Sequence, residues 1–172
     1  VIVQDNNFLG KESWENNLES VVSETNIPEI VNVDFLSRPD PLERSRKISE
    51  NYILIFIPEN INSSPLSINA FEDAANYTCR KNNKKPAFYR KPNEGSWYKY
   101  EDFANSVTPT GGWHLVRKEI VPRSYSKNFE KQNKLVSSVL NLEIAGARTL
   151  AVAIGMNYLN SEERLFKYPR CA

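Results

Sequence analysis

The chain has 172 residues, of which 40% are hydrophobic and 25% charged, and its formal net charge is +1. This composition excludes a disordered chain, and the small net charge argues against a dedicated DNA-binding domain. No apolar run approaches the length of about 20 residues that a membrane helix needs, so we expect no membrane association. A chain of this length can bury its own core, and we expect one domain over residues 1–172. The first residue is valine rather than methionine, which indicates that a preceding segment has been removed or left out.

The first third of the chain predicts short elements of both kinds. Apolar residues at helical spacing predict a helix over 11–25, and alternating polarity predicts a strand over 31–35. Asp40 stands before a proline, as a residue that caps a helix does, so a helix is expected over 41–50. Residues 52–57 are continuously apolar and rich in β-branched side chains, which predicts a central strand covered on both faces.

The rest of the chain is more helical. Helices are predicted over 70–80, 127–141 and 143–160, and a strand over 113–121. The last helix is apolar nearly all round, so it should be buried on most sides. Its small residues would let a neighbour approach closely: Gly146, Ala147, Ala151 and Gly155. The expected fold is therefore α+β: a small, mostly antiparallel sheet packed against several helices, with one nearly fully buried C-terminal helix.

Residues 80–100 combine basic and aromatic side chains. Seven arginines and lysines interleave with five aromatic residues, and the segments 86–91 and 97–100 could pair as a hairpin. Exposed tryptophan, tyrosine and arginine are the usual anchors of protein interfaces. With the loop and strand at 108–118, this stretch predicts the following binding residues: Arg90, Trp97, Tyr98, Lys99, Tyr100, Trp113 and Arg117.

Three interpretations of this stretch remain open at the level of sequence. Its aromatic residues can pack inward in a solvated hairpin, bind a protein, or stack on single-stranded nucleic acid. Because the net charge is close to zero, a protein partner is favoured over nucleic acid. The leading hypothesis is a non-enzymatic module that binds a macromolecule.

An enzymatic function is the alternative. His114 is the sole histidine and could act as a base toward Cys79, or toward Ser106 or Ser124, in a hydrolase or transferase. No local motif of such enzymes is present. The loop that ends at Gly112 precedes a predicted strand, whereas a phosphate-binding loop precedes a helix. We therefore do not expect this loop to bind a nucleotide.

The two cysteines, Cys79 and Cys171, are expected to be free thiols in a reducing compartment, with a disulfide between them as the alternative. Free thiols would place the protein in the cytoplasm or, after export, in a host cell. With two cysteines and one histidine outside any ligand-type spacing, we expect neither a metal site nor a cofactor.

The C-terminal third carries a resemblance. Residues 113–124 open with a tryptophan in a strand and continue through a lysine–acid pair to a proline, and Lys127, Phe129 and Gln132 follow. Together with Tyr168-Pro169-Arg170-Cys171 they resemble a family of uncharacterised proteins of intracellular bacteria, over about residues 113–172. Arg123 departs from the family pattern, which has glycine there. The resemblance implies a bacterial protein of effector type whose relatives continue past the cysteine, and it implies no activity.

Overall fold

A computed structural model describes residues 7–20, 22, 28, 31–89, 96–107, 111–139 and 142–166. Its helices are α1 (Lys11–Leu18), α2 (Val33–Leu36), α3 (Ile48–Asn51), α4 (Ile68–Lys81), α5 (Asp102–Asn105), α6 (Phe129–Ser137) and α7 (Ala147–Ser161). Its strands are β1 (Phe8–Leu9), β2 (Pro39–Asp40), β3 (Glu43–Lys47), β4 (Tyr52–Ile57), β5 (Asn60–Ile61), β6 (Ser64–Pro65) and β7 (Gly112–Arg117). Helices and small sheets together confirm the predicted α+β class.

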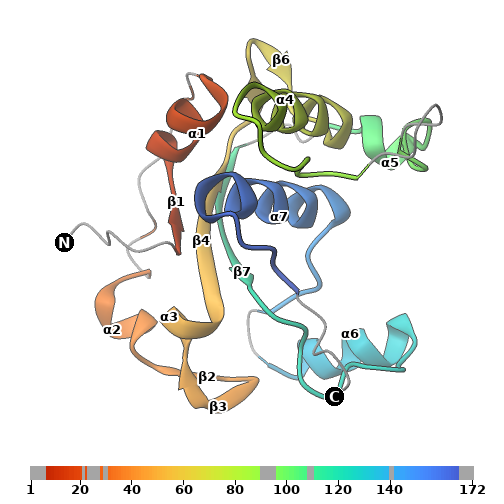
Figure 1. Cartoon of the computed structure of the whole chain (residues 1–172). Coiled ribbons are helices and arrows are strands. Elements are labelled where there is room, and N and C mark those ends of the chain that lie inside the picture. Colours follow the sequence, from red (N-terminus) through yellow and green to blue (C-terminus); the bar gives the residue numbers. More distant parts are fainter. Residues whose placement is uncertain are drawn as a thin grey trace.

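The largest sheet has the strand order β1-β4-β7 (Figure 1). β4 is central, as its continuous apolar sequence predicts, and each of its six residues is buried. β7 runs antiparallel to β4 with Tyr52 opposite Arg117, whereas β1 runs parallel to it. The two-stranded sheets β2-β3 and β5-β6 are antiparallel, so the described sheets are mostly antiparallel, as expected.

A side chain of α1, Trp14, donates a hydrogen bond to a β4 carbonyl that lies past the end of the short strand β1. β1 is opposite only Leu54 and Ile55 of β4. The indole Nε1 of Trp14 donates a hydrogen bond of 2.8 Å to the carbonyl oxygen of Phe56, and the Trp14 side chain is fully buried. A buried carbonyl that no strand reaches therefore has a side-chain donor.

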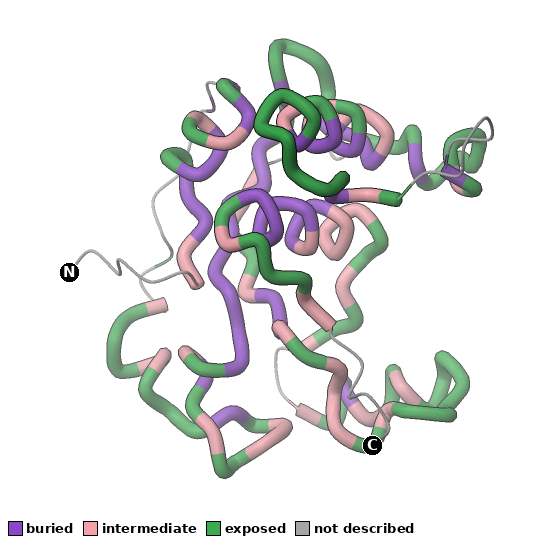
Figure 2. Tube along the Cα trace, viewed as in Figure 1, coloured by how far each residue is buried: buried purple, intermediate pink, exposed green. Residues whose placement is uncertain are grey.

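Helices α1, α4 and α7 share the hydrophobic core with the sheet (Figures 1 and 2). From Val152 to Leu159 the residues of α7 are buried, except for the half-buried Ile154. The first turn of α7 is more exposed, so the predicted buried helix starts later than expected. Gly155 explains how closely α7 packs: a Cβ there would lie 2.5 Å from the Phe71 ring of α4. The predicted close approach is confirmed at Gly155 but is wrong at Gly146, where an added Cβ would meet nothing within 4 Å.

The predicted helix over 41–50 is wrong. Residues 43–47 form β3, and α3 covers only Ile48–Asn51. The carboxylate of Asp40 accepts a hydrogen bond from the N–H of Leu42, two residues on, which makes a turn instead of a helix cap. The predicted strand over 31–35 is also wrong, because the side chain of Asn32 accepts from the N–H of Phe35 and starts α2.

The predicted hairpin within 80–100 is also wrong. In its described parts, 80–89 and 96–100, no strand forms: α4 extends to Lys81, and residues 97–100 are turns. The predicted helix over 127–141 is observed as α6, which is shorter, and the strand over 113–121 as β7. Among the described helices, none combines the length and the apolar character needed to cross a membrane.

Candidate functional site

Four aromatic side chains gather in the segment that ends in α5. Trp97 and Tyr100 are 81% and 85% exposed, and Phe103 is 40% exposed. The ring centroid of Trp97 lies 5.4 Å from that of Tyr98 and 6.2 Å from that of Phe103. We call Trp97, Tyr98, Tyr100 and Phe103 the aromatic platform. Folding leaves two of its largest side chains in water, which is unusual for tryptophan and tyrosine.

The buried carboxylate of Glu72 holds the platform to α4. The hydroxyl of Ser96 donates to its Oε1 at 2.5 Å, and the hydroxyl of Tyr98 donates to its Oε2 at 2.6 Å. Glu72 is 1% exposed. Both oxygens of a buried acid therefore fix the residues on either side of Trp97, and Tyr98 serves as an anchor as well as a surface residue.

Two further contacts fix the far end of the platform. The amide of Asn69 donates to the carbonyl oxygen of Lys99 and to Oδ1 of Asn105, both at 2.8 Å. Ala104 of α5 is fully buried. The exposed rings are thus carried on a backbone held at both ends, so little conformational entropy remains to be lost when a partner binds.

The charge of the platform segment is slightly negative. Lys99 is its single cation, with its Nζ 5.9 Å from the centre of the Tyr100 ring, and Glu101 and Asp102 follow directly. The neighbouring basic residues are partly neutralised by acids of other elements. Lys81 pairs with Glu19, and Lys84 lies 2.9 Å from Glu162. Phosphate groups gain little attraction here.

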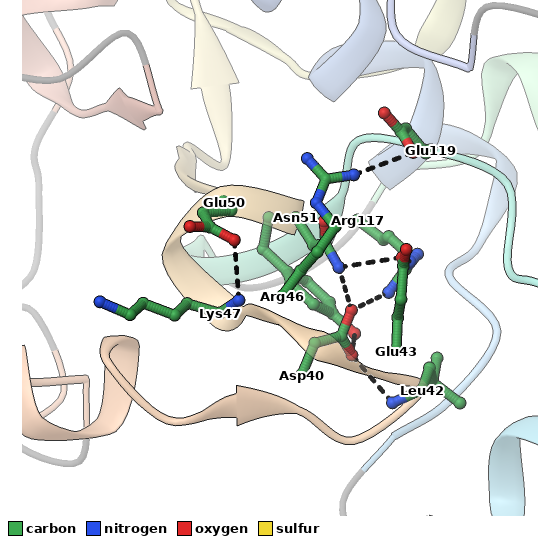
Figure 3. Close-up of polar contacts among 10 residues, drawn as sticks. Asp40, Leu42, Glu43, Arg46, Lys47, Glu50, Asn51, Arg117 and Glu119 are labelled. Carbon is green, nitrogen blue, oxygen red and sulfur yellow. Dashed lines mark hydrogen bonds and ion pairs between the residues drawn. The ribbon is translucent and has the colours of Figure 1, made fainter.

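Arg117, predicted as a binding residue, is instead buried in an ion-pair cluster (Figure 3). Its two outer nitrogens bind Asp40 and Glu43, the latter at 2.7 Å. The amide of Asn51 donates to the same two carboxylates, and the Tyr52 hydroxyl donates to Asp40. With its side chain 8% exposed, Arg117 is not available to a macromolecular partner. The cluster attaches the β2-β3 hairpin to the main sheet.

The protonation of Asp40 reflects this cluster. Burial alone would raise the pKa of the Asp40 carboxyl, but the hydrogen bonds from Asn51 and Leu42 and the charge and hydrogen bond of Arg117 outweigh it. The pKa of Asp40 is therefore held below its ordinary value. Asp40 stays ionised in the folded protein at neutral pH.

The remaining predicted binding residues do not join the platform. Trp113 of β7 packs against the rings of Phe8 and Phe56, with centroids 5.3 and 5.5 Å away, and is partly buried. Arg90 lies outside the described residues. The structure therefore brings together Trp97, Tyr98, Lys99 and Tyr100 and adds Phe103, which sequence reasoning missed although it stands only three positions after Tyr100.

The pair required by the enzyme alternative is not assembled. Cys79 is fully buried in α4, and burial raises the pKa of its thiol, which keeps it protonated. His114 is exposed on β7. Partial desolvation of the imidazole and the charge of Arg148 lower the pKa of His114 below its ordinary value, and the charge of Glu143 opposes them. Among the described residues, no hydrogen bond joins His114 to Cys79, Ser106 or Ser124.

Comparisons of the chain with protein-family models, with curated proteins and with solved structures found no significant match. Within the described part of the chain, no group of three or more histidine, cysteine or acidic side chains is placed to hold a metal ion.

Proposed function

We propose that this protein is a non-enzymatic binding module that engages a protein partner through the aromatic platform. The observation that carries the proposal is the pairing of exposure with rigidity. Trp97 and Tyr100 are more than four-fifths exposed, while Glu72 binds the residues on either side of Trp97 and Asn69 binds the backbone carbonyl just before Tyr100. Rigid, exposed aromatic side chains contribute much of the binding energy of protein interfaces at a small entropic cost.

A protein is favoured over nucleic acid by the charge of the segment. Single-stranded nucleic acids need cations along the backbone path as well as rings for stacking. The platform segment carries one cation, Lys99, and two acids, Glu101 and Asp102. The nearby Lys81 and Lys84 form ion pairs with acidic side chains of other elements. The resemblance of residues 113–172 to proteins of intracellular bacteria supports a bacterial, effector-type setting for this binding.

The test is a pair of double variants, each of which removes two exposed aromatic side chains. Trp97→Ala with Tyr100→Ala removes the most exposed rings and leaves the Tyr98 anchor intact. Tyr77→Ala with Tyr125→Ala removes two rings that are 61% and 48% exposed on α4 and before α6. Circular dichroism and thermal unfolding verify that both variants fold.

A partner isolated on the wild-type protein is then purified and titrated against each variant. We expect the platform variant to lose at least about 30-fold in affinity, as the loss of a hot spot does, and the control variant to bind like the wild type. Equal binding by the platform variant and the wild type would refute the proposal. Oligonucleotide binding that depends on Trp97 and Tyr100 would instead assign the surface to nucleic acid.

A further inference from the structure

A hollow of about 590 Å³ lies between α1, α4 and the β5-β6 hairpin, which are neighbours in Figure 1. Its α4 wall is made by residues that recur at helical spacing and so share one face of the helix: Ala70, Ala74, Tyr77, Thr78 and Lys81. Asn69 and Glu72, the residues of α4 that hold the aromatic platform, lie on another face. The hollow is therefore a site separate from the platform.

Small side chains on α4 leave room for this hollow. Ala70 and Ala74 stand one turn apart, and neither side chain extends past its Cβ, so the wall is low between the larger residues around it. Leu18 and Ile61 also line the hollow and are buried, which makes part of its surface apolar. The rest of the lining is mainly polar, and we call the site the polar hollow.

Neutral hydrogen-bonding groups dominate this polar part. They come from all three elements: Asn16, Asn17, Asn62, Ser64, Thr78 and Asn82. The side chains of Asn16, Asn62 and Asn82 are exposed, and they make no hydrogen bond with any other residue that the structure describes. An amide side chain offers two donors and one acceptor. The polar hollow therefore presents donors and acceptors that folding has not used.

The charge of the polar hollow is balanced. Of the described residues that line it, Glu19 and Lys81 are the charged ones, and they form an ion pair with each other between the ends of α1 and α4. A bound anion or cation would have to compete with this pair and would gain little net attraction. The lining thus favours an uncharged ligand.

We propose that the polar hollow binds an uncharged carbohydrate of one or two sugar rings. Each sugar hydroxyl both donates and accepts, as the amides and hydroxyls of the lining do, so the two surfaces can form hydrogen bonds in either direction. A sugar ring also has a face of C–H groups that can pack on an aromatic ring, and the Tyr77 side chain is 61% exposed. The volume lies within the range of about 300–1,000 Å³ for small-molecule sites.

Other uncharged ligands suit this lining less well. A purely apolar molecule would remove water from the amides without replacing its hydrogen bonds. An extended peptide adds to a sheet edge through its backbone, whereas side chains of two helices and of a hairpin with two-residue strands form this lining. A helical peptide needs an apolar groove. A polyhydroxylated ligand is the one that uses both the amides and the exposed ring.

The test is a titration of the full chain with neutral disaccharides: cellobiose, maltose, lactose and di-N-acetylchitobiose. Cellobiouronic acid and the deacetylated glucosamine dimer are the charged counterparts of the first and the last, and blocked trialanine represents a peptide. Binding is followed by NMR of the side-chain amides of Asn16, Asn62 and Asn82. Asn133, exposed on α6, is the control amide away from the hollow.

We expect at least one neutral disaccharide to bind with a Kd of about 5 mM or tighter and to shift the three amides of the hollow but not Asn133. The charged compounds should bind at least about fivefold more weakly than the tightest neutral one. No binding by any neutral disaccharide, tighter binding of a charged compound, or shifts confined to Asn133 would overturn the proposal. Tighter binding of blocked trialanine would assign the hollow to peptides instead.

Matched variants test the location. Ala74→Met extends a side chain from the α4 wall, whereas Ala147→Met does so at an exposed position of α7, and we expect only the first to weaken disaccharide binding, by at least about tenfold. Tyr77→Ala should weaken it too, unlike Tyr125→Ala, which removes an exposed ring elsewhere. Wild-type binding by a folded Ala74→Met variant would contradict the proposal. If that variant does not fold, the exposed Tyr77 position decides.

The double variants described for the platform keep the two proposals apart. Trp97→Ala with Tyr100→Ala should lose the protein partner and keep the disaccharide, and Tyr77→Ala with Tyr125→Ala should do the reverse. Loss of the disaccharide in the platform variant alone would show that the sugar binds at the platform and not in the polar hollow. Either proposal can therefore fail while the other stands.

Discussion

Arg117 and Asp40, 77 positions apart in the chain, meet in a buried ion pair that joins the last strand of the main sheet to the β2-β3 hairpin. Asp40 is fully buried and Arg117 nearly so. Both charges have several partners, which offsets the cost of removing them from water. The hairpin is short and carries mostly exposed side chains, so this pair and the bonds that surround it attach the hairpin to the protein.

We expect the substitution Arg117→Met to reduce the free energy of unfolding by about 3–5 kcal/mol, because it leaves the buried carboxylate of Asp40 without its cation. The control is Arg46→Met, which breaks the exposed pair between Arg46 and Glu119 and should cost less than about 1 kcal/mol. Urea unfolding measures both. Equal effects of the two substitutions would show that burial does not set the strength of the Arg117 pair.

The pKa of Asp40 predicts how stability depends on pH. Because this pKa is lower in the folded than in the unfolded protein, the unfolded state takes up the proton first as the pH falls. The stabilisation is thus present above about pH 4 and is lost as the pH falls through the folded-state pKa. Urea unfolding between pH 6 and pH 2.5 should show a steeper acid loss for the wild type than for Asp40→Asn. The control Asp34→Asn, at an exposed position of α2, should keep the wild-type slope.

Replacement of Glu72 by alanine should loosen the aromatic platform without touching its exposed rings. The hydroxyls of Ser96 and Tyr98 would lose their acceptor, and we expect a loss of about 2 kcal/mol in stability. In protein labelled with fluorotryptophan, the fluorine NMR signal of Trp97 should sharpen as the ring gains freedom. Glu101→Ala, at an exposed position beside the platform, should change neither quantity, and an unchanged Trp97 signal in Glu72→Ala would argue against the anchor.

The substitution Trp14→Phe should destabilise the protein by about 1–3 kcal/mol, because the buried carbonyl of Phe56 loses its donor while most of the apolar volume is kept. Trp97→Phe is the matched control, since Trp97 is 81% exposed, and it should be close to neutral for stability. Thermal unfolding compares the two. A Trp14→Phe variant as stable as the wild type would mean that the indole hydrogen bond is not needed.

Cys79 should be unreactive in the folded protein. Its thiol is buried and its pKa is raised, so the reactive thiolate is scarce. In a Cys171→Ser background, a disulfide reagent at pH 8 should label Cys79 slowly under native conditions and completely in urea. Complete labelling within the mixing time would revive a catalytic role for Cys79 beside His114.

The sequence predicted the elements whose pattern is strong over a long window. β4 was predicted at its observed bounds because six consecutive apolar residues suit a strand covered on both faces. α4 and α7 were predicted within a few residues because their apolar faces follow the helical period. In these cases local preference and tertiary packing favour the same structure.

Two of the failures, at Asp40 and Arg117, come from residues whose role is set by distant partners. Asp40 precedes a proline, as a helix cap often does, but its carboxylate binds Arg117 and Asn51. The fold brings both of these side chains to Asp40 from other elements. The prediction of Arg117 as a binding residue is wrong for the same reason, because no local sequence feature marks an arginine that is buried in the fold. Within the platform, Trp97 and Tyr100 could be predicted from composition, whereas the acceptor role of Glu72 depends on a contact over 24 residues.

The indole of Trp14 also protects an open edge of the main sheet from pairing with other chains. A sheet whose outer strand is only two residues long leaves part of the neighbouring strand open to pairing, and such an open edge is a template for aggregation or strand addition. Trp14 occupies the Phe56 carbonyl with a side chain and fills the adjacent space with a bulky ring, so an incoming strand finds neither the acceptor nor room to lie flat.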